Sequence, residues 1–390
     1  MAPVVHALKK TPSLETRVCI SSQHRELLLP VLDLFDIGVD YDLDIMRPNQ
    51  SLTTITVRIL EALERVCDDF RPDMVAVHGD TTTAFSSALS AFYHKVRIAH
   101  VEAGLRTFDL MSPWPEELNR KLVGGIADLH FAPTDSARSN LLLENVAEES
   151  IHVTGNTVVD ALLYMRQKIH DDSQLRKGIE ENYSFLDSNK KLILVTGHRR
   201  ESYGPGFQSI CDALRDIAVQ FEDSVEIVYP LHLNPNVKEP VTERLSNISN
   251  LYLVDPTDYV NFIYLMERSH IILTDSGGVQ EEAPAFGKPV LVMPNKTERT
   301  EAIDAGSALL VGTDREKIVS AVSTLLTRPE SYREMSRVSN PFGDGKAAIR
   351  IAKTIANHLL QPQPRRQSVF DGDIPGKLRP ISLLCPSWVR

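Results

Sequence analysis

The chain has 390 residues, of which 42 are Lys or Arg and 52 are Asp or Glu, so its formal net charge is −10. This acidic balance argues against binding to nucleic acid or to a membrane surface, but it is compatible with a small anionic ligand. The length and the ordinary composition, with 42% hydrophobic residues, predict two globular domains.

Short β-rich apolar runs alternate with helical patterns along the first half, which predicts a parallel α/β sheet. The predicted strands cover residues 17–20, 74–77, 97–101, 129–132 and 151–153. Apolar residues spaced three and four apart predict helices over 25–35, 52–70, 83–94, 116–128, 136–144 and 158–170.

A charged, turn-prone stretch over 171–191 is interpreted as a linker, and a second βα series follows it. Its predicted strands cover 192–196, 225–229, 251–254, 271–274, 290–293 and 308–311, with helices that include 206–221 and 316–327. The predicted fold class is α/β, with two Rossmann-like doubly wound domains that face each other across a cleft.

The predicted domain organisation has five parts. They are an N-terminal domain (1–157), a connecting helix and linker (158–191), a C-terminal nucleotide-binding domain (192–342), a C-terminal helix (343–360) and an irregular tail (361–390). The tail is rich in proline and has no sustained period.

Four scattered cysteines, Cys19, Cys67, Cys211 and Cys385, show neither disulfide-framework nor zinc-ligand spacing. No metal site is expected. No apolar run approaches the roughly 18 residues needed to span a bilayer, so no membrane insertion is expected and the protein is predicted to be cytoplasmic.

Polar residues that directly follow a strand are the first candidates for a site, because ligands of open parallel sheets bind beyond the carboxyl ends of the strands. Asp80 follows one such strand, and it is either an acid–base group or the N-cap of the next helix. Glu102 ends another strand, and it has either a partner such as Arg106 or a catalytic task. Glu116 and Glu117 fit the acidic first turn of a helix.

The second half carries features suited to a phosphate. The segment 275–278, Asp-Ser-Gly-Gly, opens a helix, so its backbone N–H groups and Ser276 could bind a phosphate and Glu282 could bind a ribose. An N-capped strand-to-helix turn is the plain alternative. His198, Arg199 and Arg200 form a cationic cluster suited to a diphosphate leaving group, whereas the role of His232 stays open.

At these residues the chain closely resembles the non-hydrolysing bacterial UDP-N-acetylglucosamine 2-epimerases, a family with a two-domain fold like that of the GT-B glycosyltransferases. The resemblance extends from residue 1 to about residue 360. The matching blocks are VHGDTTTAF, HVEAGLRT, SPWPEELNR, TGNTVVDAL, VTGHRRESYG, YPLHLNPNV, TDSGGVQEEAPAFGKPVLVM and NPFGDGKA.

The resemblance implies reversible inversion at C2 of the sugar, with UDP lost and re-added and no cofactor. The implied catalytic residues are Asp80, Glu102, Glu116 and His198. The implied binding residues are Ser276, Gly277 and Gly278 for the phosphates, Arg299 for the diphosphate, Glu282 for the ribose, and Phe262 and Thr257 for the uracil.

The implied partners are UDP-N-acetylglucosamine, UDP and a second copy of the chain in a homodimer. Some members of the family are activated by their own substrate at a second site, and Gln23, Arg199 and His232 match parts of that site. Glu26 stands where other members have a different polar residue.

One departure from the family lies at the N-terminus. Members of the family begin with a strand and a Gly-Thr-Arg-Pro loop, whereas this chain starts at the helix that follows them, so a central strand of the first sheet is expected to be missing. The loss would leave ladder groups unpaired on both neighbouring strands. A lost or misassigned start is therefore expected.

Three other functions stay open on the sequence alone. A GT-B glycosyltransferase would share the fold but gives no reason for three carboxylates in the first domain. A hydrolysing epimerase, which would release free N-acetylmannosamine, is distinguished from the non-hydrolysing kind only by the family resemblance. A truncated chain could instead bind a nucleotide sugar with little turnover.

Overall fold

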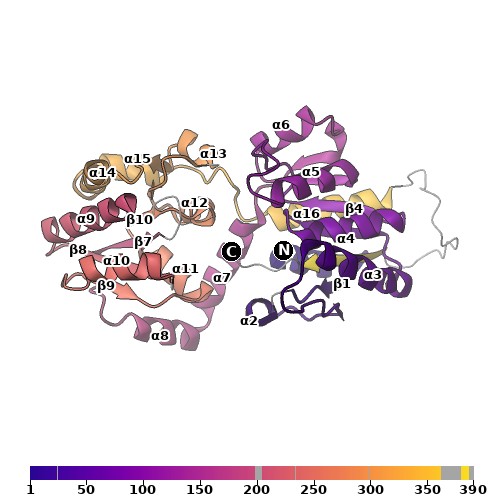
Figure 1. The fold of residues 1–390 in the computed structure, drawn as a ribbon, viewed down its shortest axis with the longest axis horizontal. Coiled ribbons are helices and arrows are strands. Elements are labelled where there is room, and N and C mark those ends of the chain that lie inside the picture. The colour runs from indigo at the N-terminus through magenta and orange to yellow at the C-terminus, as the bar shows by residue number, and fades with distance from the viewer. Residues whose placement is uncertain (24, 198–203, 233, 298, 362–378, 386–390) are drawn as a thin grey trace. The chain divides into compact units, whose positions relative to one another are not determined.

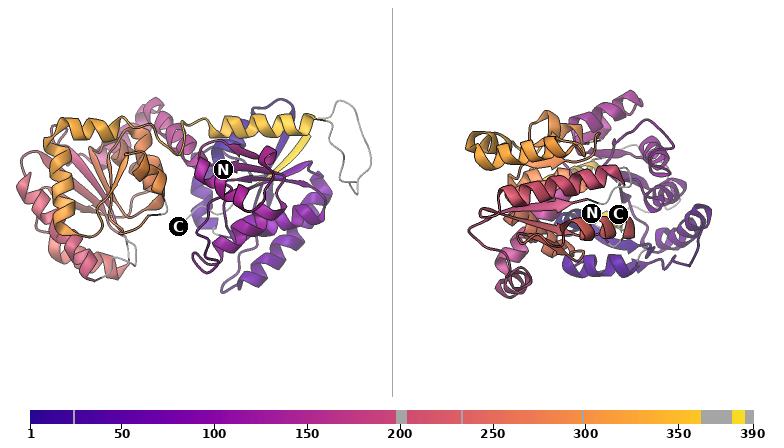
Figure 2. Two further views of the ribbon diagram at one scale, coloured as in Figure 1. Left: turned by 90° about the horizontal axis from the view of Figure 1, so that it is seen from above. Right: turned by 60° about the vertical axis from the view of Figure 1, so that its left-hand side comes forward.

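The computed structural model describes residues 1–23, 25–197, 204–232, 234–297, 299–361 and 379–385. The chain forms two compact units, Met1–Asp160 with Gly345–Arg390, and Ala161–Asp344. Each unit contains one sheet in which every described strand pair is parallel, with helices on both faces (Figures 1 and 2). The predicted α/β class with two doubly wound domains is confirmed.

The N-terminal unit is built on seven described strands in the order β2-β1-β13-β3-β4-β5-β6. The strands are β1 (Leu14–Ile20), β2 (Tyr41–Asp42), β3 (Met74–His78), β4 (Arg97–Val101), β5 (Leu129–Ala132), β6 (Ile151–Val153) and β13 (Arg379–Cys385). The helices are α1 (Ala2–Lys9), α2 (Arg25–Leu34), α3 (Leu52–Phe70), α4 (Thr82–Tyr93), α5 (Glu116–Ile126), α6 (Asp135–Leu143), the first residues of α7 (Thr157–Asp171) and α16 (Ala347–Leu360).

The core of this unit follows from the strand sequences. The central strands β3 and β4 are almost continuously apolar and are buried on both faces, as parallel strands between helix layers must be. Helices α3, α4 and α5 pack side by side, and α1 packs against α16. The amphipathic helix α3 buries Ile55, Ile59 and Leu63 against Val75 and Val77 of the sheet.

The C-terminal tail differs most from its prediction. Residues 379–385 form β13, which lies between β1 and β3 and pairs with both, so the prediction of an irregular tail is wrong for this segment. The central position that was expected to be empty is occupied by β13. Figure 2 shows this yellow strand among the indigo and purple strands of the sheet.

The second unit contains six described strands in the order β12-β11-β10-β7-β8-β9. The strands are β7 (Lys191–Thr196), β8 (Val225–Pro230), β9 (Leu251–Val254), β10 (Ile271–Thr274), β11 (Val290–Val292) and β12 (Ala308–Leu310). The helices are α8 (Ser173–Asn182), α9 (Pro205–Gln220), α10 (Pro235–Leu245), α11 (Tyr259–Arg268), α12 (Gly277–Glu282), α13 (Thr300–Asp304), α14 (Arg315–Thr327) and α15 (Pro329–Ser336).

Two segments differ from the predicted domain organisation, one in its secondary structure and one in the unit to which it belongs. The stretch interpreted as a linker contains α8, whose N-cap Asp172 accepts hydrogen bonds from the backbone of Gln174 and Leu175. Helix α16 belongs to the N-terminal unit, where the Asp160 carboxylate accepts from the N–H groups of Ala347 and Ala348. The carboxylate thus satisfies two backbone donors at the start of α16.

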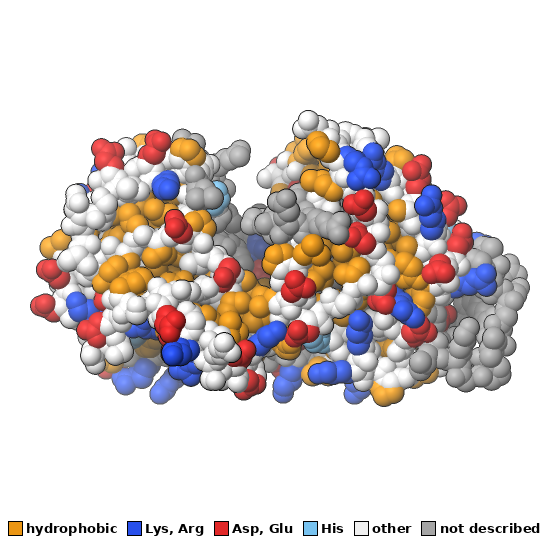
Figure 3. Space-filling view, turned by 90° about the horizontal axis from the view of Figure 1, so that it is seen from below, with side chains coloured by type: hydrophobic (Ala, Val, Ile, Leu, Met, Phe, Trp, Pro, Cys, Tyr) orange, Lys and Arg blue, Asp and Glu red, His pale blue; other side chains and the backbone are white. Residues whose placement is uncertain are grey.

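The surface carries charged side chains of both signs, as the composition of the sequence implies. On the face in Figure 3, Lys and Arg side chains are interspersed with Asp and Glu on both units. Within the described part of the chain, no helix combines the length and the apolar character that crossing a membrane requires. The described cysteines Cys19, Cys67 and Cys211 are free thiols, and all three are buried.

Candidate active site

The turn after β3 carries the first predicted carboxylate. Gly79 has a positive φ of 68°, and the chain then passes through Asp80 to Thr81, the N-cap of α4. The Thr81 side chain accepts the hydrogen bond from the Ala84 N–H at 3.1 Å. Because Thr81 caps the helix, the alternative that Asp80 is the cap is wrong.

Helix α5 holds Asp80 in place. The Nε and Nη2 groups of Arg120 donate to Oδ2 of Asp80 at 3.1 and 2.8 Å, and the Asn119 amide donates to the Asp80 carbonyl oxygen at 2.9 Å. The Nη1 group of Arg120 also donates to Glu117 at 3.0 Å, and the Glu117 side chain is fully buried. A buried guanidinium thus joins two carboxylates and fixes the direction of Asp80.

The second predicted carboxylate, Glu102, directly follows β4 and has a left-handed conformation with φ 61°. Its Oε2 lies 3.8 Å from Nε2 of His78, and its side chain keeps 20% of its exposure. Arg106 donates to both oxygens of Glu144 at 3.0 and 2.7 Å instead. The alternative in which Arg106 is the partner of Glu102 is therefore wrong.

His78 is the neighbour of Glu102 and is itself buried. Burial, followed by the positive N-terminus and by His100, lowers the pKa of His78 well below its usual value. The imidazole is therefore neutral near pH 7, and it faces the Glu102 carboxylate as a polar group rather than as a cation.

Glu116, the third predicted carboxylate, stands in the first turn of α5 and is half-buried. It precedes Glu117 on the helix whose Asn119 and Arg120 contact Asp80. The positive end of the helix dipole favours carboxylates at this place. The structure thus brings Asp80 and Glu102 to one edge of the sheet, with Glu116 on the helix that contacts Asp80.

The predicted phosphate-binding residues meet at the start of α12 in the second unit. Ser276 occupies the N-cap position, but its side chain makes no capping hydrogen bond. A Cβ at Gly277 would lie 3.1 Å from Cζ of Arg299, so the guanidinium lies directly over this glycine. Arg299 is held there by Glu281, which accepts from its Nε at 2.9 Å. Together with Gly278, these groups present N–H, hydroxyl and cationic donors.

Helix α11, which carries Phe262, packs against the short 3-10 turn (Ala283–Phe286) that directly follows α12. Glu282 is buried at the end of α12, and burial, followed by the charge of Glu281, raises its pKa to about 8. At neutral pH the Glu282 carboxyl group therefore keeps its proton and can donate as well as accept. Thr257 precedes α11, Phe262 lies in its first turn, and both side chains are half-buried.

Of the remaining predicted residues, the structure describes Gln23 and His232. His198, Arg199 and Arg200 lie outside the described residues. In the N-terminal unit, Gln23 accepts a hydrogen bond from the Thr83 hydroxyl at 3.2 Å. His232, in the second unit, is exposed, and its Nδ1 accepts from the Asn234 N–H at 3.1 Å.

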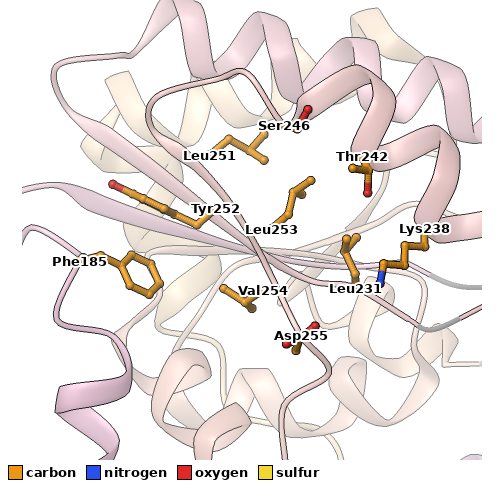
Figure 4. Close-up of a pocket in the computed structure, with 10 residues that line it drawn as sticks. All are labelled: Phe185, Leu231, Lys238, Thr242, Ser246, Leu251, Tyr252, Leu253, Val254 and Asp255. Atoms are coloured by element: carbon orange, nitrogen blue, oxygen red, sulfur yellow. The ribbon is translucent and has the colours of Figure 1, made fainter.

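A pocket of about 500 Å³ beside β9 contains none of the predicted site residues. Figure 4 shows its apolar wall, Leu231, Leu251 and Leu253, with Lys238 and Asp255 beside it. Across the described part of the chain, no group of three or more His, Cys, Asp or Glu side chains could hold a metal ion.

Sequence reasoning missed the residues that orient the carboxylates, namely His78, Glu117, Asn119 and Arg120. A signal existed for two of them, because Glu117 and Arg120 are three residues apart on a predicted helix and so share a face. The contact between Arg120 and Asp80, which are 40 positions apart, has no local signal.

The N-terminal unit is expected to lose stability in acid. Burial lowers the pKa of His100 to about 3, from an ordinary value of 6.5. Between these values the unfolded chain binds a proton at His100 that the folded unit does not. The free energy of unfolding should therefore fall with decreasing pH, by about 1.4 kcal/mol per pH unit for this residue.

The variant His100→Gln tests this assignment, since a glutamine amide can still donate to the Gly79 carbonyl oxygen, which lies 2.8 Å from the imidazole Nε2. Urea unfolding at several values between pH 6 and pH 4 should show a shallower pH slope for the variant. Equal slopes for both proteins would exclude His100 as a source of acid sensitivity.

The chain is similar to known proteins over most of its length. Residues 6–356 match the family model described as UDP-N-acetylglucosamine 2-epimerase. The Yersinia pestis and Escherichia coli K12 proteins of that name are 58% and 55% identical over 360 residues, which cover 92% of this chain and 96% of each relative. A crystal structure of the Neisseria meningitidis enzyme bound to UDP-GlcNAc aligns with a TM-score of 0.82 at 47% identity, covering 92% of this chain and 96% of that one.

Proposed function

Because the chain belongs to the UDP-N-acetylglucosamine 2-epimerase family, we propose that it is an isomerase that interconverts UDP-N-acetylglucosamine and UDP-N-acetylmannosamine. The observation that carries this proposal is the pair of carboxylates Asp80 and Glu102 at one edge of the N-terminal sheet, which Arg120 and His78 accompany. Such a pair provides acid–base groups for a proton transfer at carbon.

The chemistry requires elimination because the C2 proton of the sugar is not adjacent to a carbonyl group. As the C1–O bond to UDP breaks, its electron pair leaves with the diphosphate, and a carboxylate removes the C2 proton to give a C1=C2 glycal. UDP then adds back to C1, and a carboxyl group protonates C2 from the opposite face. No electron leaves or enters the substrate, so the reaction needs no redox partner.

The two units have separate tasks in this proposal. Asp80, Glu102 and Glu116 in the N-terminal unit exchange the C2 proton. Ser276, Gly277, Gly278 and Arg299 in the second unit bind the diphosphate and stabilise its charge as UDP leaves, and His198 assists there. Glu282 binds the ribose, and Phe262 with the main chain near Thr257 binds the uracil.

Incubation with UDP-N-acetylglucosamine in deuterium oxide tests the function. Deuterium at C2 together with UDP-N-acetylmannosamine is the expected result. Release of free N-acetylmannosamine would instead indicate a hydrolysing enzyme, and binding without exchange would indicate an inert nucleotide-sugar binder. Transfer of the sugar to an added acceptor would indicate a glycosyltransferase.

Replacing the cation over Gly277 should weaken UDP binding. Arg299→Gln removes the charge that faces the proposed diphosphate, and we expect the dissociation constant of UDP to rise about 10- to 100-fold. The matched control is Arg315→Gln, which removes an exposed arginine that pairs with Asp216 in the same unit. Isothermal titration of UDP should separate the two variants, and equal affinities would remove Arg299 from the site.

A homodimer in the cytoplasm is part of the proposal. Helices α4 and α5 pack together and expose Phe92, Leu118 and Leu122, which suits an interface with a second copy. Light scattering should give twice the mass of one chain, and the double variant Leu118→Asp and Leu122→Asp should give the mass of one. The same mass for both proteins would exclude this interface.

Activation by substrate is proposed through Gln23, Arg199 and His232. Sigmoidal kinetics, together with a requirement for UDP-N-acetylglucosamine in the reverse direction, would support a second site. Strictly hyperbolic kinetics without that requirement would exclude it.

A further inference from the structure

The strand order of the two units reveals an unusual role for β13. In the second unit the strand that comes first in the chain, β7, is central, with β8 and β9 on one side and β10, β11 and β12 on the other. In the N-terminal unit β1 and β2 lie on one side and β3 to β6 on the other, but the central strand comes last in the chain. Strand β13 therefore holds the place of a first strand, at the point where the winding direction of the sheet reverses.

The pairing shows that β13 bridges two otherwise separate halves of the sheet. All seven of its residues pair with Leu14–Ile20 of β1, and Ile381, Ser382 and Leu383 also pair with Met74, Val75 and Ala76 of β3. Among the described pairings, none joins β1 directly to β3. Without β13, adjacent edges of both strands would keep unpaired backbone groups inside the core.

Burial makes the loss of β13 costly, because the backbone groups left unpaired on β1 and β3 lie in the core. Val18, Cys19 and Ile20 of β1 are at most 1% exposed, and Met74 and Ala76 of β3 are fully buried. These strands lie between helix layers, where water cannot easily replace the missing hydrogen bonds.

The sequence of β13 suits a position between two strands. Ile381 is fully buried, and the run Ile-Ser-Leu-Leu-Cys is mainly aliphatic. Pro380, which lacks an N–H group, pairs only with Glu15 of β1, and the pairing with β3 begins one residue later. Proline is disfavoured where a strand is paired on both sides, and Pro380 lies outside that stretch.

We propose that the gap between β1 and β3 is a strand-acceptor site, and that residues 379–385 fill it within the same chain. The ligand class is an extended, mainly aliphatic peptide that enters parallel to both neighbours. This site is distinct from the proposed epimerase site. Its occupation determines whether β1 and β2 are joined to β3–β6 in one continuous sheet. When it is filled, β1 and β13 end together at Ile20 and Cys385, beside β3, which ends at His78, two residues before Asp80.

Removing residues 379–390 tests the proposal. Hydrogen exchange of amides in β1 and β3 should accelerate on the order of 100-fold or more, whereas amides of β7 and β8 in the second unit should change little. Adding a synthetic peptide of residues 377–390, KLRPISLLCPSWVR, should restore the protection of β1 and β3. A peptide with the same residues in scrambled order is the control. Unchanged exchange after the deletion, or equal rescue by both peptides, would overturn the proposal.

A substitution in the full-length chain gives an independent answer if the shortened chain does not stay soluble. Ile381→Asp places a charge at a fully buried position, and Ile349→Asp makes the same change at a residue of α16 that is 63% exposed. Faster exchange of β1 and β3 is expected for the first variant only, and Ile381→Ala should show a smaller effect in the same strands. Equal behaviour of the two aspartate variants would overturn the proposal.

Dilution distinguishes the same chain from a second copy as the source of the strand. Protection of β1 and β3 in the full-length protein should not depend on protein concentration when the strand binds within one chain. Protection that falls on dilution would show that a second copy supplies the strand, and it would overturn the assignment to the same chain. None of these measurements depends on epimerase activity, so they fail or succeed independently of the proposed reaction.

Discussion

Glu102→Gln is expected to lower turnover of UDP-N-acetylglucosamine by at least about 100-fold, because an amide cannot exchange the C2 proton. The substitution keeps the size of the side chain at the end of β4, so the fold should change little. The rate of deuterium incorporation at C2 and the circular dichroism spectrum measure the two effects separately. Asp80→Asn should give a loss of the same order, since the amide oxygen can still accept from Arg120.

The matched control is Glu64→Gln on the exposed face of α3, which should keep the wild-type rate. A near-wild-type rate for Glu102→Gln or for Asp80→Asn would remove that residue from the catalytic set. A lost fold in either variant would instead assign the carboxylate a structural role.

Gly104→Ala should produce the largest loss of stability from a single methyl group. Gly104 has a φ of 90°, and a Cβ there would lie 2.2 Å from the carbonyl oxygen of Ala137 in α6. The strained backbone and the collision together should lower the free energy of unfolding by about 3 kcal/mol or more. Because Glu102 is two residues away, turnover should fall as well.

Gly125→Ala is the comparison for this variant. A Cβ at this exposed position of α5 meets nothing within 4 Å, and alanine should raise the stability of the helix by up to about 1 kcal/mol. Thermal unfolding of both variants measures the difference. A Gly104→Ala protein as stable as wild type would contradict the close approach of α6 to this loop.

The strands were predictable where several apolar residues follow one another. The predicted bounds 97–101, 129–132, 151–153, 251–254 and 271–274 coincide with the observed strands. Strands β5 and β10 are buried throughout and β4 almost throughout, so there the apolar run and the strand are the same set of residues, whereas β6 and β9 are buried only at their first residue. The edge that carries Asp80 and Glu102 was predictable for a related reason, because parallel strands end at one side of the sheet.

The partners of these carboxylates could not be predicted from local sequence. Arg106 is four residues from Glu102, yet it pairs with Glu144, which α6 brings alongside. Arg120 reaches Asp80 from another helix. In both cases the contact depends on how helices pack on the sheet, and spacing along the chain does not contain that information.

Strand β13 was missed for a different physical reason. Its seven residues include Pro380, which argues against a central strand, and its first partner in the pairing, Leu14, precedes Arg379 by 365 positions. Neither composition nor periodicity can identify a partner at that separation. Only the strand order of the folded sheet identifies β13 as the central strand.

The position of β13 has a consequence for biosynthesis. The second unit, Ala161–Asp344, is continuous in the chain, so it can fold while the ribosome is still translating the remainder. The N-terminal unit is translated first but cannot close its sheet until Arg379–Cys385 has left the exit tunnel. Its early strands must therefore wait, with unpaired edges exposed, until residue 385 has been translated. The order of folding would then be the reverse of the order of synthesis, and the waiting N-terminal half would be the segment that most needs a chaperone.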